Sequence, residues 1–93
     1  MPSAAPLGVP VPVATTPAAR LLGLALLDRE RAGPGLLIPR CGSVHTVGMR
    51  FELDLLFLDR AGRVLELRRS LGPGRLARCR GAAAVLELPS PGR

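Results

Sequence analysis

The sequence predicts a single domain of the α+β class, mostly antiparallel β, with one or two short helices. The chain has 93 residues, which is the length of one small domain. An apolar stripe of helical period follows Thr16-Pro17, and an alternation of apolar and polar residues begins at Met49, turns near Gly62 and returns. Hydrophobic residues make up 47% of the chain, which is enough for a small core.

The N-terminal residues are rich in proline. Half of the ten prolines lie among the first 17 residues, a pattern typical of extended or disordered chain. We therefore expect a flexible tail at residues 1–10 and a single domain at residues 11–91. Val11 and Val13 can add a short strand, and Pro12 between them restricts that strand to a sheet edge.

A helix is expected after the proline-rich segment. Thr16 supplies an N-cap hydroxyl and Pro17 suits the first helical position. The helix should end near Asp28. Residues 33–35 (Gly-Pro-Gly) force a turn, and residues 36–38 then form a short buried strand. The apolar stripe that predicts the helix consists of Ala18, Leu21, Leu22, Ala25 and Leu26.

The strongest β signal predicts a hairpin over residues 49–68, and residues 82–88 predict a last strand. The loop Arg60-Ala61-Gly62 suits a type I turn with a bulge, which requires a positive φ at Gly62. Asp59 then faces Arg63. The apolar side chains that alternate along the outgoing strand are Met49, Phe51, Leu53, Leu55 and Phe57.

The same turn fixes a register for the hairpin. Leu55 is expected opposite Leu67, and Asp54 opposite Arg68. A four-residue loop would instead place Leu55 opposite Glu66. We prefer the first register because it pairs apolar residues with each other.

Composition excludes several classes of protein. No apolar run approaches the roughly 20 residues that a membrane-spanning helix needs, so we expect no membrane association. The first 17 residues lack the basic and apolar regions of a signal peptide, which favours the cytoplasm. Cys41 and Cys79 are then expected as reduced thiols.

The net charge of +6 invites a nucleic-acid interpretation. We do not favour it, because every basic residue is arginine and arginine accompanies abundant Ala, Gly and Pro, as a G/C-rich genome would produce. An arginine-rich binder of nucleic acid or of an acidic partner is kept as an alternative. Arg75 also follows a Gly-Pro-Gly loop whose amides can approach an anion.

Three soft side chains follow one another at a spacing of four residues. Cys41, His45 and Met49 would suit copper. On a continuous strand, however, neighbouring members lie roughly 13 Å apart. We therefore expect no metal and no cofactor, with Met49 in the core and Cys41 as a small buried group.

His45 is the single histidine and the natural candidate for acid/base chemistry. A hydrolase-like enzyme would need Cys41 or Cys79 as a nucleophile within hydrogen-bond reach of His45. A histidine hydrogen-bonded near a loop is the simpler interpretation. Asp54 pairs with Arg68 in the expected register, and a carboxylate that faces a ligand is its alternative role.

These residues resemble the small prokaryotic family catalogued as domain of unknown function 192. The resemblance covers about residues 11–91 and is most specific in SVHTVGMRFELDLLFLD. It implies a compact, barrel-like, mostly antiparallel domain, and it carries no catalytic role. The family's Met-basic pair matches Met49-Arg50, its strand aspartate matches Asp54, and the His-Thr element of some members matches His45-Thr46.

The chain departs from the family pattern in three places. Glu52 replaces a usual proline, Val47 replaces a common aromatic residue, and relatives usually continue beyond residues 91–93 with a further helix and strand. An element missing there would leave a sheet edge open to self-association.

The leading hypothesis is a binding or accessory module that is not an enzyme. Polar and soft side chains concentrate in residues 41–54, while most of the chain is expected as core or as solvated arginine. The partner would be a small ligand or a protein. The residues expected to bind it are His45, Met49, Arg50, Asp54 and Arg68.

Overall fold

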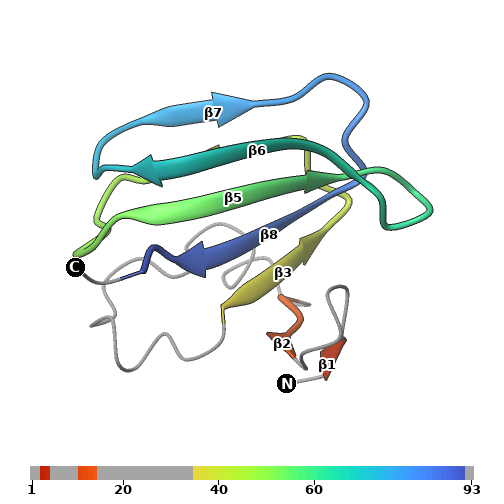
Figure 1. Cartoon of the computed structure of the whole chain (residues 1–93), viewed down its shortest axis with the longest axis horizontal. Coiled ribbons are helices and arrows are strands. Elements are labelled where there is room, and N and C mark those ends of the chain that lie inside the picture. Colours follow the sequence, from red (N-terminus) through yellow and green to blue (C-terminus); the bar gives the residue numbers. More distant parts are fainter. Residues whose placement is uncertain (1–2, 5–10, 15–34, 92–93) are drawn as a thin grey trace.

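The computed structural model of the chain describes residues 3–4, 11–14 and 35–91 (Figure 1). The described part contains eight strands. They are β1 (Ser3–Ala4), β2 (Val11–Pro12), β3 (Leu36–Pro39), β4 (Ser43–His45), β5 (Leu53–Leu58), β6 (Val64–Leu71), β7 (Leu76–Arg78) and β8 (Ala84–Pro89).

Four of these strands form the central sheet, in the order β3-β8-β5-β6. All neighbours in this sheet are antiparallel. The expected strand after the Gly-Pro-Gly turn is confirmed as β3, and the expected last strand is confirmed as β8. Two further antiparallel pairs, β1-β2 and β4-β7, lie outside this sheet. The short strand expected at Val11 is confirmed as β2.

Three of the strand pairs are nested along the chain. The innermost is β5 with β6, where Leu58 faces Val64. Outside it β4 pairs with β7, with Ser43 opposite Arg78, and outside that β3 pairs with β8. Each outer pair therefore encloses the inner ones in sequence.

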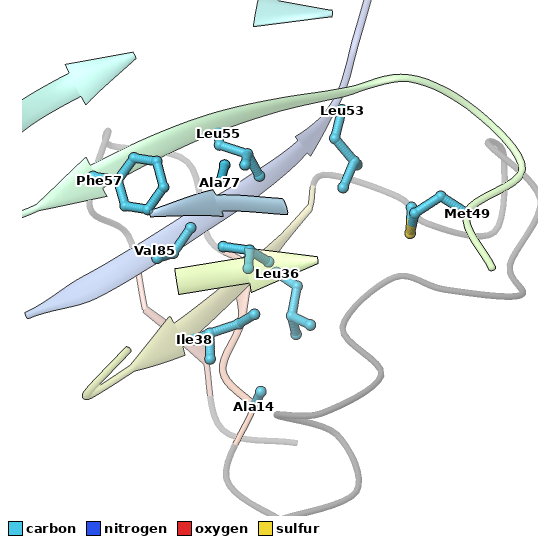
Figure 2. Packing of buried hydrophobic residues seen from close by; sticks show 10 residues of the cluster. Ala14, Leu36, Ile38, Met49, Leu53, Leu55, Phe57, Ala77 and Val85 are labelled. Atoms are coloured by element: carbon cyan, nitrogen blue, oxygen red, sulfur yellow. The ribbon is translucent and has the colours of Figure 1, made fainter. Parts of the chain in front are cut away.

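The two faces of the central sheet bury different clusters of apolar side chains. Side chains alternate between the faces of a strand, so successive residues of β5 belong to different clusters. The β4-β7 pair contributes Val44 and Ala77 to the first cluster. Figure 2 shows Ala77 beside Leu55 and Phe57. The buried members of the first cluster are Ala14, Leu36, Ile38, Val44, Met49, Leu53, Leu55, Phe57, Ala77 and Val85. Those of the second are Val11, Leu56, Leu58 and Leu86.

The turn between β5 and β6 has the geometry that the sequence predicts. Asp59 faces Arg63, because the Asp59 amide donates to the Arg63 carbonyl at 2.9 Å. Gly62 has a φ of 83°, which confirms the left-handed position expected there. The Asp59 carboxylate accepts hydrogen bonds from the amides of Ala61 at 2.9 Å and Arg63 at 2.8 Å. The aspartate therefore holds the turn through its own side chain.

The register expected beyond this turn is wrong. Arg68 faces Leu55 rather than Asp54, and Leu67 faces Leu56 rather than Leu55. The cause is an irregularity in the ladder between Phe57 and Leu58, and a second one between Leu53 and Leu55 shifts the pairing again, so that Leu53 faces Leu71. Each inserts one extra residue in β6, and a bulge of this kind moves all later pairs by one position.

The expected fold class is also wrong for the described residues, which are all-β in antiparallel sheets without a helix or a closed barrel. The barrel does not close because β3 and β6 end the central sheet on opposite sides and are not bonded to each other. The β4-β7 pair covers a face of the sheet instead of joining its edges (Figure 2). The helix expected over residues 16–28 lies outside the described residues, as does most of the tail expected at residues 1–10.

Candidate functional site

The β4-β7 pair carries the part of the chain where polar residues concentrate. Val44 faces Ala77 across this pair, and both side chains are buried in the first cluster. His45 faces Leu76 one position further on. Because successive side chains alternate, His45 and Leu76 lie on the outer face of the pair. The register thus places the histidine beside an apolar residue at the end of the strands.

Thr46, directly after β4, joins two loops that are distant in sequence. Its side chain is fully buried, and its hydroxyl donates to the Gly72 carbonyl at 2.7 Å and accepts from the Arg75 amide at 2.7 Å. Its own amide donates to the Arg75 carbonyl at 2.8 Å. Its carbonyl accepts from the amides of Met49 and Gly74, both at 3.1 Å. We call these five bonds the Thr46 clamp.

The Thr46 clamp occupies the backbone amides that the sequence suggests for anion binding in the Gly-Pro-Gly loop. The amides of Gly74 and Arg75 both donate to Thr46 within the protein. A backbone donor that already has a partner gains little from an anion. The loop therefore offers the exposed Arg75 side chain, rather than its amides, to a ligand.

His45 is half-buried, and its two exposed neighbours are apolar. The Nδ1 atom of its ring is buried and has no hydrogen-bond partner among the described residues. Val47, two residues later, is 62% exposed, and Leu76, opposite His45, is 63% exposed. These are the two most exposed large hydrophobic side chains in the described part. Two strongly exposed apolar side chains thus accompany His45, one two residues later in the chain and one opposite it in the strand pair.

Met49 and Arg50 point to different environments. Met49 is only 6% exposed and lies at the Leu53 end of the first cluster (Figure 2). Its sulfur is therefore part of the core, as the simpler interpretation of the Cys-His-Met series expects. Arg50 is exposed. Among the described residues, no group of three or more His, Cys, Asp or Glu side chains is placed to hold a metal ion.

Asp54 lies on the other face of the central sheet from the β4-β7 pair. Its neighbours Leu53 and Leu55 belong to the first cluster together with Val44, whereas Leu56, which shares the face of Asp54, belongs to the second. The structure therefore does not place Asp54 on the same face as His45, with which it is expected to bind a partner.

The Asp54 carboxylate has one structural partner on β6 and one directly after β8. Its Oδ1 atom accepts from the Ser70 amide at 2.9 Å and from the Ser90 hydroxyl at 2.7 Å. Ser70 has a φ of 55°, a left-handed conformation that is uncommon outside glycine and asparagine. Asp54 thus holds the second irregularity of β6. Arg68 pairs instead with Glu66 of its own strand, so the expected Asp54–Arg68 pair is not formed.

Neither cysteine is joined to His45 by a hydrogen bond. Both are free thiols and partly buried against the first cluster. The Cys41 thiol donates to the Ser43 carbonyl at 2.9 Å, and the Cys79 thiol contacts the Arg80 carbonyl at 3.7 Å. The Cys79 amide donates to Gly42, three residues before His45 and so roughly 10 Å away along an extended strand. The geometry of a nucleophile-base pair is therefore not present.

Several residues that shape this region do not stand out in the sequence. Thr46 belongs to the His-Thr element, but nothing in the pattern shows that its hydroxyl reaches a loop 26 residues away. Leu76 follows a turn where no strand is expected, and the β4-β7 pairing that exposes it is apparent only in three dimensions. Glu87 is a carboxylate only 2% exposed on the central strand β8. In the sequence it lies between two leucines, the pattern of an exposed residue in an alternating strand, so its burial is not predicted.

A family model, DUF192, described as an uncharacterized ACR, matches residues 3–91. No curated protein matches the chain. A solved structure of a protein of unknown function from Novosphingobium aromaticivorans is similar in fold, with a TM-score of 0.68 and 23% sequence identity. The alignment covers 84% of this chain and 61% of the other, so the chain spans less than two thirds of that protein's length.

Proposed function

The chain belongs to the DUF192 family, and on that premise we propose that it is a binding module, not an enzyme. Its ligand surface is proposed at the outer end of the β4-β7 pair. We call this the His45 surface and define it by His45, Val47, Arg75 and Leu76. The observation that carries the proposal is the pair of highly exposed apolar side chains, Val47 and Leu76, beside a histidine whose Nδ1 has no hydrogen-bond partner among the described residues.

The chemistry of this surface suits a small amphipathic partner. Binding sites combine apolar walls with a few polar groups that fix orientation. Val47 and Leu76 provide the apolar contact, and the His45 ring provides a hydrogen-bonding atom. Arg75 adds a positive charge beside Leu76. The partner is then an apolar molecule with a hydrogen-bonding or acidic group, or a protein segment with such side chains.

The Thr46 clamp supports the proposal because it fixes the backbone on both sides of the surface. Val47 directly follows Thr46, and Leu76 directly follows Arg75, whose amide and carbonyl both bond to Thr46. Rigid support reduces the conformational entropy that binding must overcome. The surface therefore stands on two loops that are hydrogen-bonded to each other through Thr46.

The alternatives have weaker support. A hydrolase-like site lacks a hydrogen bond between His45 and either thiol in the described part of the chain. Single-stranded nucleic acid is recognised by stacking on exposed aromatic side chains. The chain has two phenylalanines and no tyrosine or tryptophan. Phe57 is fully buried, and Phe51 is partly buried against the core. The proposed setting is the cytoplasm, where free thiols such as Cys41 and Cys79 stay reduced.

None of the described residues forms a helix that is long and apolar enough to cross a membrane.

The test is native mass spectrometry on protein purified from cells without reductant or chelator. Wild type is compared with Leu76→Asp and with the control Leu65→Asp, which changes an exposed leucine of β6, a strand that pairs with neither β4 nor β7. We expect an additional small-molecule mass on wild type and on the control, and its loss from Leu76→Asp. Ligand retained by Leu76→Asp would contradict the proposed location.

A bare chain mass for wild type contradicts the small-ligand form of the proposal. Affinity capture with the same three proteins then tests the protein-partner form. We expect a partner that binds wild type and Leu65→Asp but not Leu76→Asp. If wild type, Leu65→Asp and Leu76→Asp all captured the same proteins, the proposal of a binding site at the His45 surface would be wrong.

A further inference from the structure

Strand β6 is an edge strand with an unusually exposed composition. No described strand pairs with it on the side away from β5. Three of its large apolar side chains are about half exposed, namely Val64 at 47%, Leu65 at 47% and Leu67 at 43%. Unpaired strand edges are templates for pairing with another chain, above all where apolar side chains accompany them.

The strand that follows β6 does not cover this edge. After the turn held by Thr46, the chain enters β7, which pairs with β4. Ala77 of β7 packs in the first cluster with Leu55 and Phe57, on a face of the central sheet (Figure 2). Among the described strands, none therefore pairs with the outer edge of β6, beside the covered face.

We propose that β6 pairs with β6 of a second copy of this chain, antiparallel and about a two-fold axis at Leu67. The charge pattern of the strand is what selects this occupant. In that register residue 66 of one copy faces residue 68 of the other, so Glu66 lies opposite Arg68 twice. Opposite charges on directly facing residues stabilise a strand pair, and like charges destabilise it.

The remaining positions of this register are also compatible. Leu67 faces Leu67 of the second copy, and Leu65 faces Arg69, whose aliphatic stem can cover it. No two arginines face each other. Within one copy Glu66 and Arg68 already form an ion pair with each other. Two copies would combine these pairs into a cluster of two carboxylates and two guanidinium groups without net charge.

Dimerisation through one strand buries little surface. Stable interfaces bury roughly 800 Å² on each partner, and an interface built on a single edge strand lies at the low end of that scale. The dimer should therefore dissociate on dilution, with a Kd on the order of micromolar or weaker. This inference concerns a different surface from the His45 surface and does not depend on it.

The experiment is sedimentation velocity of the full chain over a range of concentrations, from about 5 μM to about 500 μM around the expected Kd. Wild type is compared with Glu66→Arg, Arg68→Glu and an equimolar mixture of the two variants. Each variant alone places like charges opposite each other across the two-fold axis, so we expect monomers. The mixture places opposite charges at both positions, so we expect dimers to return.

The mixture separates the proposal from a role of the ion pair within one chain. Neither variant has its Glu66–Arg68 pair, and mixing cannot restore that pair inside a chain. A dimer in the mixture therefore requires contact between copies in the proposed register. Leu76→Asp is the control that should dimerise like wild type, because Leu76 lies outside β6. Far-ultraviolet circular dichroism establishes that each variant is folded.

Wild type that remains monomeric at the highest concentration would overturn the proposal. So would dimers of either single variant as strong as those of wild type, or a mixture that stays monomeric while wild type dimerises.

Discussion

Strands β5 and β6 belong to one hairpin and are both rich in leucine, yet their side chains differ sharply in burial. Five of the six residues of β5 are buried, whereas six of the eight residues of β6 are exposed. β5 is bonded to β8 on one side and to β6 on the other, and each of its faces contributes to an apolar cluster. In the described part of the chain, β6 is bonded on one side only.

The contrast shows that apolar content does not decide burial within this hairpin. Leu67 and Leu56 face each other across the ladder, but Leu56 is 9% exposed and Leu67 is 43% exposed. The difference follows from position, because a central strand is covered by its neighbours and an edge strand is not. The stability of the domain should therefore depend on β5, while β6 is free to serve as a surface.

Truncation of β5 should produce the largest effect. Phe57→Ala removes a fully buried ring from the first cluster and should lower the free energy of unfolding by about 3–5 kcal/mol. Leu65→Ala on β6 removes a half-exposed side chain and should cost less than about 1 kcal/mol. Urea denaturation of both variants measures the difference. Similar costs for the two would show that β6 is as well packed as β5.

The next largest effect should come from the connection between β6 and β7. Thr46→Val keeps the shape of the side chain but leaves the Arg75 amide and the Gly72 carbonyl without the hydroxyl. We expect a loss of about 2–3 kcal/mol, because an unpaired buried polar group keeps its full desolvation cost. Thr46→Ser retains the hydroxyl and should lose only about 1 kcal/mol for the missing methyl group.

Chemical denaturation compares the two threonine variants directly. Equal destabilisation would mean that packing of the methyl group, and not the clamp, holds the loop that follows β6.

A smaller effect is expected at the second irregularity of β6. Asp54→Ala removes the acceptor for the Ser70 amide and the Ser90 hydroxyl and should cost about 1–2 kcal/mol. Asp54→Asn keeps an oxygen acceptor and should cost less. Amide hydrogen exchange gives a local readout, since the Ser70 amide should exchange faster in Asp54→Ala than in wild type. Unchanged protection at Ser70 would contradict the proposed role of Asp54.

The smallest effect concerns the turn that joins the two strands. The hydrogen bond from the Arg63 amide is the main cause that lowers the pKa of Asp59 below its ordinary value of 3.8. A lowered pKa in the folded state stabilises the fold above the unfolded pKa, and this contribution is lost as pH falls through the folded pKa. The stability difference between wild type and Asp59→Asn should therefore shrink below about pH 4.

A nuclear magnetic resonance titration of the Asp59 carboxyl group measures this pKa directly. A midpoint at or above 3.8 would contradict the hydrogen-bonded turn.

The sequence predicts the local features of this hairpin better than its pairing. The turn at Asp59–Gly62 is recognisable because only glycine adopts its left-handed position without strain, and Gly62 has the expected φ. The register is not recognisable, because neither irregularity of β6 falls at a glycine: the first lies between Val64 and Glu66, and the second lies at Ser70. The expected barrel is wrong for a related reason. Closure requires the two outer strands of the sheet, β3 and β6, to pair with each other, and the residue pattern within one strand does not show which strand it pairs with.

The candidate site shows the same limit. His45 could be selected from the sequence because its side chain has chemistry that no other residue has. Asp54 lies close to His45 along the chain, but alternation places the two on different layers of the fold. Leu76 could not be selected, since its importance comes from facing His45 across a pair formed by residues more than 30 positions apart.

The nested order of the strand pairs has a consequence for how the chain folds. The entropy lost on closing a loop grows with its length, and a loop that contains an already formed hairpin is effectively shorter. Once the Asp59–Gly62 turn joins β5 to β6, the β4-β7 pair closes only the short segments between the inner and outer strands. The β3-β8 pair follows in the same way. We expect folding to begin at that turn and proceed outward, so substitutions at Asp59 should slow folding while substitutions in β3 should mainly speed unfolding.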